Sequence, residues 1–516
     1  MPFNPRRVLA LILTGVVALG LTMAGPAASS EMAVSPGVMV QGCCAAASLE
    51  PDWASAAVGL AASEPICPAD LLRPGVTPFA PGFTPQGSFG QDLPPVAALL
   101  DPAAPEPTAQ QIGAAAAGFT AETTGPGFGL QVRDLVTGQV LYETAADQPR
   151  TPASTMKTLT ATAAIATLGA KATLSTTVVM VQSAANQATV TLVGGGDVLL
   201  GPGGSQVSAV AGRAGLGDLA NQVAVTLRGR GIAQVNLALD DTLFTGPNQL
   251  EDWGWWIGAA WGGLVTPLAV NGGRDGAEFD QVNYSADAAM AAAQHFYSLL
   301  AEAGADQSLA LPTFEMTGSV TRAAAPAEAI EVGRVDSAPI DQVTAYMLQH
   351  SDNVVAESLG RLVAQAQGLP ASFVGAGQGI AQAIADLGVD TTGVVIIDAS
   401  GLSPASKIPP AVLTDLLVKV GAPDTDQLGA VLRGLAIGGL QGTLAHRLGQ
   451  PPTAGNVRAK TGTLSGVTTL AGTVQTAGGR QLVFAAMADS VQEVGYDTAR
   501  TAIDRFVTEL AALPAP

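Results

Sequence analysis

The hydrophobic period of the chain changes between residues 128 and 168, and this change predicts its first ordered elements. Apolar and polar residues alternate along 128–134 and 138–142, which is the period of β-strands and predicts a hairpin. The pair Thr151-Pro152 is typical of a helix start, because proline fits the first helical turn. The apolar residues that follow predict a helix over 153–168 that ends at Gly169.

The middle of the chain, from residue 172 to 325, consists of short β-type runs separated by turns. The runs 188–193 and 235–239 are examples, and one helix is expected over 286–303. A tryptophan cluster lies in this region. Its large rings are expected to anchor a small domain against the rest of the protein, with stacking on sugar rings as the alternative. The cluster consists of Trp253, Trp255, Trp256 and Trp261.

The last part of the chain, 326–516, returns to longer elements. A helix is expected over 340–349 and another from Val354 onward. The runs 466–474 and 481–487 alternate like an antiparallel hairpin. Apolar residues on one stripe predict a closing amphipathic helix over 497–510.

The N-terminus has the pattern of an export segment. Arg6 and Arg7 precede an uncharged apolar run over 8–21, and small residues follow over 24–30. Residues 1–30 are therefore predicted to be a signal peptide. An uncleaved membrane anchor is the alternative, because the uncharged stretch is long enough to span a bilayer. Either way the protein is expected to be exported to the extracytoplasmic side of the cell envelope.

Residues 31–108 are predicted to form an extended linker. They are rich in proline, alanine, glycine and serine, a composition that does not sustain a helix or a sheet. All three cysteines of the chain lie in this stretch. In an oxidising compartment, Cys67 could pair with either Cys43 or Cys44.

Length, charge and histidine content narrow the classes of function. A chain of 516 residues is too long for one core, so about two or three domains are expected. The net charge of −19 argues against nucleic acid as a partner, because that partner requires clustered Lys and Arg. The scattered histidines, His295, His350 and His446, offer no ligand spacing, so neither a metal nor another cofactor is expected.

Three short motifs follow one another in a fixed order. They are Ser154-x-x-Lys157, Ser351-Asp352-Asn353 and Lys460-Thr461-Gly462. Each motif alone has an ordinary structural explanation, as a helix surface, a helix cap or a hairpin turn. Together, and in this order, they resemble the motif set of penicillin-binding proteins and serine β-lactamases.

The chemistry of acyl transfer explains the first two motifs. A serine hydroxyl is a poor nucleophile until a base takes its proton. Three residues along a helix place Lys157 within reach of Ser154, and burial beside a second cation would favour its neutral amine. Ser351 is expected to pass a proton to the leaving amine, and Asn353 to bind Lys157 or the substrate amide.

The third motif is expected to bind the substrate. Lys460 would supply a local positive charge on an acidic protein, and Thr461, Gly462 and Thr463 would form a strand edge for a carboxylate and a peptide backbone. The backbone N–H groups of Ser154 and Thr463 are the expected oxyanion hole.

The spacing of the motifs narrows the resemblance to the penicillin-binding protein 4 type of D-alanyl-D-alanine carboxypeptidase. The gap between Ser154 and Ser351 is much longer than in class A β-lactamases or small carboxypeptidases. Further stretches also match this type, although Ala399 stands where it usually has glycine. These stretches are 192–197, 240–244, 398–403 and 442–444.

The resemblance implies an α+β fold. A transpeptidase/β-lactamase-like domain, with a five-stranded antiparallel sheet between helices, would be built from 109–171 and 326–516. Residues 172–325 would be an inserted β-rich region of one or two small domains.

The resemblance also implies a substrate and further site residues. Ser154 would be acylated by peptidoglycan stem peptides ending in D-Ala-D-Ala, and β-lactam antibiotics would acylate it as covalent inhibitors. Some relatives also cut the D-Ala to diaminopimelate cross-link, so the sequence leaves an additional D,D-endopeptidase activity open. An acidic residue of the insertion would hold the diaminopimelate side chain. The candidate for this acidic residue is Asp241, and Arg447, Leu464 and Ser465 are further substrate-binding candidates that lie nearby by motif position.

Two other classes of function fit less well. A class A β-lactamase uses a glutamate in a Glu-x-x-Leu-Asn loop for fast deacylation, and the chain contains no Leu-Asn pair. A non-catalytic wall-binding protein would not need three intact motifs.

Overall fold

The computed structural model describes residues 103–256, 261–275, 283–308, 310–422, 425, 427–492 and 495–514. The predicted export segment 1–30, most of the predicted linker 31–108 and the cysteines with their predicted pairing lie outside the described residues. The last residues of the predicted linker are described, and one of them is already part of the fold: Ala104 is buried and its carbonyl accepts a hydrogen bond from Arg480 Nη1 at 3.0 Å.

The first sheet is antiparallel and has the strand order β11-β12-β13-β14-β1-β2. Strand β1 comes early in the chain and pairs with β14 near its end, so segments on both sides of the long gap between the motifs build one sheet. The α+β fold class is confirmed, and a two-residue edge strand, β11, is added to the five long strands that were expected. The strands are β1 (Phe128–Asp134), β2 (Val140–Thr144), β11 (Ala436–Ile437), β12 (Val457–Leu464), β13 (Val467–Gln475) and β14 (Gln481–Ala488).

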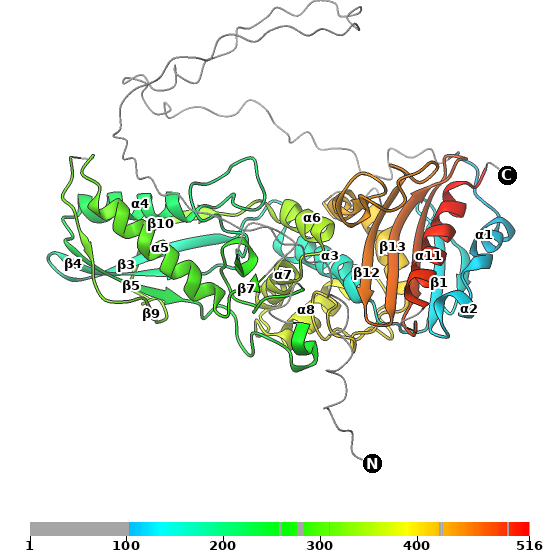
Figure 1. Ribbon diagram of the computed structural model, residues 1–516, viewed down its shortest axis with the longest axis horizontal. Coiled ribbons are helices and arrows are strands. Elements are labelled where there is room, and N and C mark those ends of the chain that lie inside the picture. The colour runs from blue at the N-terminus through cyan, green and yellow to red at the C-terminus, as the bar shows by residue number, and fades with distance from the viewer. Residues whose placement is uncertain are drawn as a thin grey trace, which may run out of the picture. The chain divides into compact units, whose positions relative to one another are not determined.

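Helices cover both faces of this sheet (Figure 1). Phe484 and Ala486 of β14 pack with the amphipathic helix α11, whereas Val483 and Ala485 belong to the larger core on the opposite face, as the alternation of strand side chains requires. On the first face lie α1 (Ala109–Ala115), α2 (Ala121–Thr124) and α11 (Tyr496–Ala511). The other helices of the domain that contains this sheet are α3 (Met156–Leu168), α6 (Ile340–His350), α7 (Asn353–Ala366), α8 (Phe373–Asp386), α9 (Pro410–Gly421) and α10 (Gly429–Gly434).

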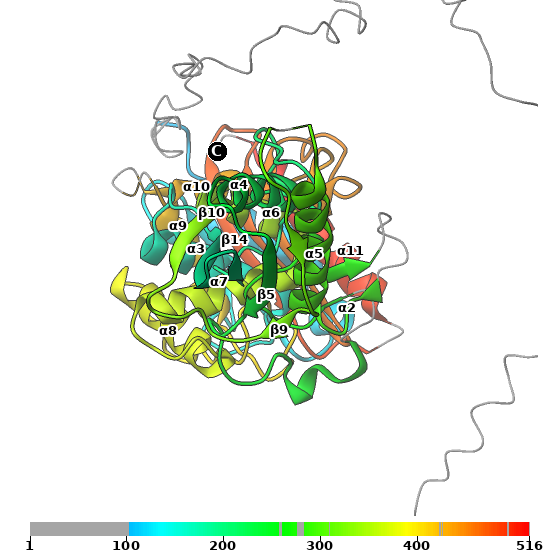
Figure 2. The same cartoon turned by 90° about the vertical axis from the view of Figure 1, so that its left-hand side faces the viewer.

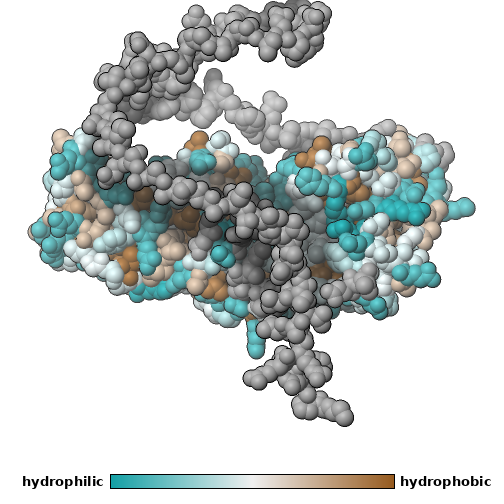
Figure 3. All heavy atoms as spheres, in the orientation of Figure 1, coloured by the Kyte–Doolittle hydropathy of each residue, from teal (hydrophilic) through white to brown (hydrophobic). Residues whose placement is uncertain are grey.

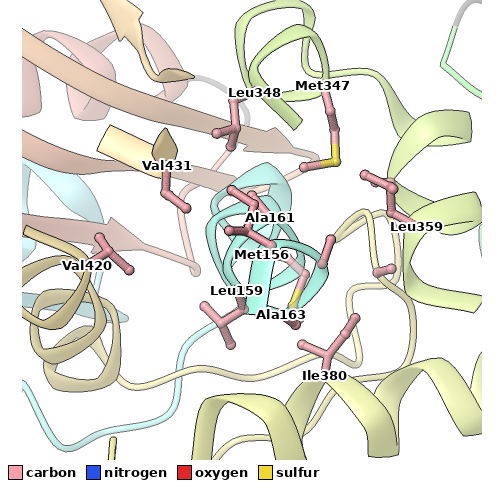
Figure 4. Close-up of a cluster of buried hydrophobic side chains, with 14 of the residues drawn as sticks. Met156, Leu159, Ala161, Ala163, Met347, Leu348, Leu359, Ile380, Val420 and Val431 are labelled. Carbon is pink, nitrogen blue, oxygen red and sulfur yellow. The ribbon is translucent and has the colours of Figure 1, made fainter. Parts of the chain in front are cut away.

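Helix α3 lies in the centre of the larger core. Every side chain from Met156 to Ile165 is buried, and Figure 4 shows α3 surrounded by apolar side chains from several other helices. Among them are Met347, Leu359, Ile380 and Val431. A helix packed on all sides has little freedom to shift, so its N-terminal turn is a rigid support for Ser154.

A second sheet is formed by the chain between α3 and α6, with the order β10-β3-β4-β5-β8 and β9 also beside β5. Strands β4 and β5 are parallel and are connected by helix α4, which was not expected from the sequence. The inserted region therefore combines its strands with the helix expected near 286–303 and with the unexpected α4, and its sheet continues through β10, past residue 325. Its main strands are β3 (Ser175–Ala184), β4 (Gln187–Val193), β5 (Gln234–Asp240) and β10 (Ile330–Asp336).

Helices α4 (Leu216–Gly229) and α5 (Ala288–Ala305) complete the inserted region, where they lie beside β10 and β5 (Figure 2). Leu219, Val223 and Leu227 of α4 form its core with Phe296 and Leu300 of α5 and with strand residues. The short strands are β6 (Arg274–Asp275), β7 (Asn283–Tyr284), β8 (Glu315–Met316) and β9 (Thr321–Arg322).

Trp253 joins the inserted region to the domain that is built around the first sheet. Its ring is buried edge-to-face against Phe373 at 5.1 Å, and its Nε1 donates to Asp398 Oδ2 at 2.7 Å. The geometry fits the expected anchoring role for this member of the cluster. Trp261 is different, because its side chain is exposed.

On the face shown in Figure 3, apolar residues appear as small separate spots among hydrophilic ones. Within the described ranges, no helix combines the length and the apolar character that crossing a bilayer requires.

Candidate active site

Ser154 lies on a 3₁₀ turn, η5 (Ala153–Thr155), that leads directly into α3. The preceding residue, Ala153, has φ 47°, a left-handed conformation that costs energy for a residue with a side chain. Close backbone packing holds the turn in place. A Cβ on Gly401 would lie only 1.9 Å from the Ala153 carbonyl oxygen, so only glycine fits there. The backbone at Ser154 is thus strained but tightly supported.

Lys157 is fully buried one turn further on, and its Nζ has three partners. It lies 2.6 Å from Asn353 Oδ1, 2.7 Å from the Ser400 carbonyl oxygen and 3.1 Å from Ser154 Oγ. The first two partners can only accept hydrogen bonds, whereas the serine hydroxyl can also donate. A neutral amine, with two N–H groups and one lone pair, would satisfy all three contacts if its lone pair faces Ser154.

Burial lowers the pKa of Lys157 to about 8, although the negative charges of Asp398, Glu357 and Asp352 act in the opposite direction. Desolvation dominates because it penalises the ammonium form of a wholly enclosed amine. At this pKa, about one amine in ten is neutral at pH 7.

The Ser351-Asp352-Asn353 motif forms the junction between α6 and α7. Ser351 is the residue that follows α6. Its φ of 54° and ψ of 38° turn the chain sharply toward α7. Asp352 caps α7, with its Oδ1 accepting from the Val355 N–H at 2.9 Å. Asn353 begins α7 and directs its Oδ1 to Lys157.

Lys460 lies on β12 and is also fully buried. Its Nζ lies 3.0 Å from Ser351 Oγ and 2.8 Å from the Thr461 carbonyl oxygen. Burial, assisted by the charge of Lys157, holds the pKa of Lys460 well below its usual range. The sequence suggested that Lys460 would supply a local positive charge. In the structure its amine is buried and hydrogen-bonded to Ser351.

Strand β12 has an open edge beside the serine turn. It pairs with β13 along its whole length from Val457 to Leu464, but β11 pairs only with Arg458 and Ala459. Within the described sheet, Lys460 to Leu464 therefore have a strand partner on one side only. Gly462 touches the serine turn, because a Cβ there would lie 2.7 Å from the Pro152 carbonyl oxygen.

A buried layer behind Lys157 was not recognised from the sequence. Glu357 of α7 accepts hydrogen bonds from the N–H groups of Ser400, at 2.7 Å, and of Ala399, at 3.2 Å. It thereby holds the loop whose Ser400 carbonyl binds Lys157. Asp398 accepts from the Gly401 and Ser403 N–H groups and from Trp253. Burial raises the pKa of both carboxyls, and the charge of Asp398 adds to this for Glu357.

The structure brings the three motifs together, but two of the additional site candidates have other partners. Asp241 Oδ2 accepts from Arg322 Nε at 2.9 Å within the insertion. Arg447 pairs with Asp504 of α11, at 2.5 Å. Both side chains therefore form ion pairs with residues outside the three motifs.

The other candidates lie on β12, within or just after the third motif, or in the turn that follows this strand. Thr461 Oγ1 lies 2.9 Å from Thr443 Oγ1, and Thr463 Oγ1 lies 3.0 Å from the Tyr496 hydroxyl. Leu464 ends the strand, and Ser465 is exposed in the turn that follows.

Comparison with known proteins agrees with this arrangement. A sequence model of the D-Ala-D-Ala carboxypeptidase 3 (S13) family matches residues 111–283 and 268–510. The carboxypeptidase DacB of Mycolicibacterium smegmatis is 33% identical over 424 residues, which is 80% of this chain and 86% of the relative. The D-alanyl-D-alanine carboxypeptidase of Actinomadura sp. strain R39 is 28% identical, over 67% of this chain and 74% of the relative.

The fold has solved counterparts. The crystal structure of penicillin-binding protein 4 (dacB) from Haemophilus influenzae superposes with a TM-score of 0.62 at 20% identity, covering 77% of this chain and 98% of that protein. The sequence match and the fold agree: the chain has the fold of penicillin-binding protein 4 and belongs to the D-Ala-D-Ala carboxypeptidase 3 (S13) family of serine peptidases.

Proposed function

We propose that the protein trims peptidoglycan stem peptides through an acyl-enzyme on Ser154, with Lys157 as the base. The observation that carries this proposal is the 3.1 Å contact between Ser154 Oγ and a fully buried amine whose pKa is lowered to about 8. A base with a pKa near the working pH is the type that removes a hydroxyl proton efficiently.

Acylation begins when Lys157 takes the Ser154 hydroxyl proton. The Oγ attacks the carbonyl carbon of the penultimate D-alanine, and the N–H groups of Ser154 and Thr463 stabilise the oxyanion. The C–N bond then breaks. Ser351 gives its hydroxyl proton to the leaving nitrogen and regains one from Lys460, to which it is hydrogen-bonded at 3.0 Å. Water later hydrolyses the ester: one of its protons restores the Ser154 hydroxyl, and its oxygen leaves with the trimmed peptide in the new carboxyl group. Proton exchange with solvent returns Lys157 to the neutral amine and Lys460 to the ammonium.

The open edge of β12 is the proposed docking site for the substrate backbone. An extended peptide can add to a strand edge through main-chain hydrogen bonds, and Lys460 to Leu464 offer such an edge. The hydroxyls of Thr461 and Thr463 would receive the terminal carboxylate. Its negative charge would raise the pKa of the buried Lys460 amine and favour the ammonium that supplies the proton to Ser351.

The family relationship supports three further parts of the proposal. We infer that β-lactams acylate Ser154, since a structure of the Haemophilus influenzae relative is described as complexed with a β-lactam. We infer that the protein acts outside the cytoplasm, where peptidoglycan lies, after export directed by residues 1–30, with cleavage or anchoring of that segment left open. We also infer that a D-Ala to diaminopimelate cross-link, which has the same acyl group, is a second substrate.

The test is release of D-alanine from a peptide ending in D-Ala-D-Ala, measured with D-amino-acid oxidase. The wild type should release D-alanine, and a folded Ser154→Ala variant should not. A cross-linked muropeptide dimer, analysed by chromatography, tests the endopeptidase activity in the same preparation. Equal D-alanine release by the wild type and Ser154→Ala would overturn the assignment of the nucleophile.

A further inference from the structure

The inserted region contacts the Ser351-Asp352-Asn353 motif at two points. Arg274 Nη2 donates to Asp352 Oδ2 at 2.5 Å, and the two side chains are only 13% and 1% exposed. Asn353 Nδ2 donates to the Trp261 carbonyl oxygen. Both partners precede β10, the last strand of the inserted sheet, so the motif is held from outside the catalytic domain.

The second contact fixes the orientation of the Asn353 side chain. An amide has one accepting oxygen and one donating nitrogen, and the nitrogen is taken by Trp261. The oxygen must then face Lys157, where it lies 2.6 Å from Nζ. The hydrogen bond between Asn353 and Trp261 of the inserted region thereby fixes Asn353 Oδ1 as the acceptor for Lys157, the proposed base.

The first contact concerns charge. Three carboxylates, those of Asp398, Glu357 and Asp352, act on Lys157 and favour its ammonium form. Asp398 and Glu357 are held by N–H donors. Asp352 is the one of the three that has an ion pair in the described structure, with Arg274.

We infer that Arg274 is a positioning residue for acyl transfer: by neutralising Asp352 it keeps the charge of that carboxylate from holding Lys157 as an ammonium. The inference rests on the proposed roles of Ser154 and Lys157. It assigns to the insertion a part in building the active site, in addition to any contact it makes with substrate.

The other side chains around the Arg274–Asp352 ion pair do not supply a positive charge to Asp352 in place of Arg274. The guanidinium lies 5.5 Å from the centre of the Tyr284 ring. Burial raises the pKa of Tyr284 and of Tyr346, so both phenols stay neutral at physiological pH. Burial lowers the pKa of His350 and so favours its neutral ring, although the charge of Asp352 acts in the opposite direction. Lys460 of β12 bonds to Ser351 rather than to Asp352.

The test is the pH dependence of acylation by a fluorescent penicillin, measured by stopped flow from pH 6 to 9.5 on the full chain. Arg274→Met leaves Asp352 uncompensated, so the pH of half-maximal acylation should rise by about one unit, with about tenfold slower acylation at pH 7. Arg274→Lys should keep most of the wild-type profile. In the double variant Arg274→Met/Asp352→Asn, the half-maximal pH should return close to the wild-type value, because no charge is left unpaired.

A purely structural role gives a different result. Loss of packing alone would slow acylation equally at every pH, and the double variant would be no better than Arg274→Met. Either result overturns the inference, as does an unchanged profile in a folded Arg274→Met. If Arg274→Met does not fold, a wild-type profile in the double variant supports the inference and a displaced one contradicts it. A wild type that penicillin does not label would instead contradict the proposed function.

Discussion

Gly462 is the point at which the open strand edge touches the turn that carries Ser154. A Cβ at this position would lie 2.0 Å from Thr469 Oγ1, 2.7 Å from the Pro152 carbonyl oxygen and 3.2 Å from Ala153 Cβ. Thr469 Oγ1 also donates to the Pro152 carbonyl at 2.9 Å, so neither oxygen can move away freely. Relief of the contact in Gly462→Ala therefore requires β12 and the serine turn to separate by about 1 Å.

Two effects of different size follow from that displacement. Overpacking of a tight contact costs about 1–3 kcal/mol of unfolding free energy, which a protein of this size tolerates. A shift of about 1 Å between reacting groups costs on the order of 100-fold in rate. Gly462→Ala should therefore fold, lose about 1–3 kcal/mol in urea denaturation, and acylate with a fluorescent penicillin on the order of 100-fold more slowly than the wild type.

Gly229→Ala is the matched control. Gly229 is the exposed last residue of α4, and a Cβ there would meet no atom within 4 Å. This variant should acylate at the wild-type rate and be slightly more stable, since alanine is favoured over glycine in a helix. A folded Gly462→Ala that acylates as fast as Gly229→Ala would refute the packing of β12 against the serine turn.

Three further predictions follow from buried groups. Because the pKa of Lys157 is lowered to about 8, acylation should be about tenfold slower at pH 6 than at pH 7; a flat stopped-flow profile would exclude this base. Burial raises the pKa of Asp197 from 3.8 to about 7. Its stabilising contribution is therefore complete below about pH 4 and is lost as the pH rises through 7. In Asp197→Asn, the fall in melting temperature between pH 5 and 8 should be smaller than in the wild type, and an equal fall would contradict this. Trp253→Phe keeps a ring beside Phe373 but removes the donor to Asp398, so urea denaturation should show a loss of about 1–3 kcal/mol; unchanged stability would show that this bond does not anchor the insertion.

The sequence predicts local relations in this protein well. The contact between Ser154 and Lys157 follows from helical spacing, and the observed starts of α6 and α11 lie within a residue of the predicted ones. Helix α4 was missed although Leu216, Leu219, Val223 and Leu227 have a helical period. Glycines on both sides of Leu216 and the neighbouring β-type runs concealed that period.

Long-range partners could not be predicted in the same way. Arg274 and Asp352 are 78 positions apart, and no spacing rule connects a guanidinium in one region to a carboxylate in another. Glu357 gave one usable signal, because it is an acidic residue on a helix that is otherwise largely apolar. The proposed role of Asp241 came from the resemblance alone, which could not reveal its partner Arg322.

The most direct measurement of the central claim is mass spectrometry of the intact protein after exposure to benzylpenicillin, followed by mapping of the labelled peptide. The account predicts one penicilloyl group per chain, attached to Ser154, and none in Ser154→Ala. A stable adduct on any other residue, or no adduct on a folded protein that still releases D-alanine, would contradict it.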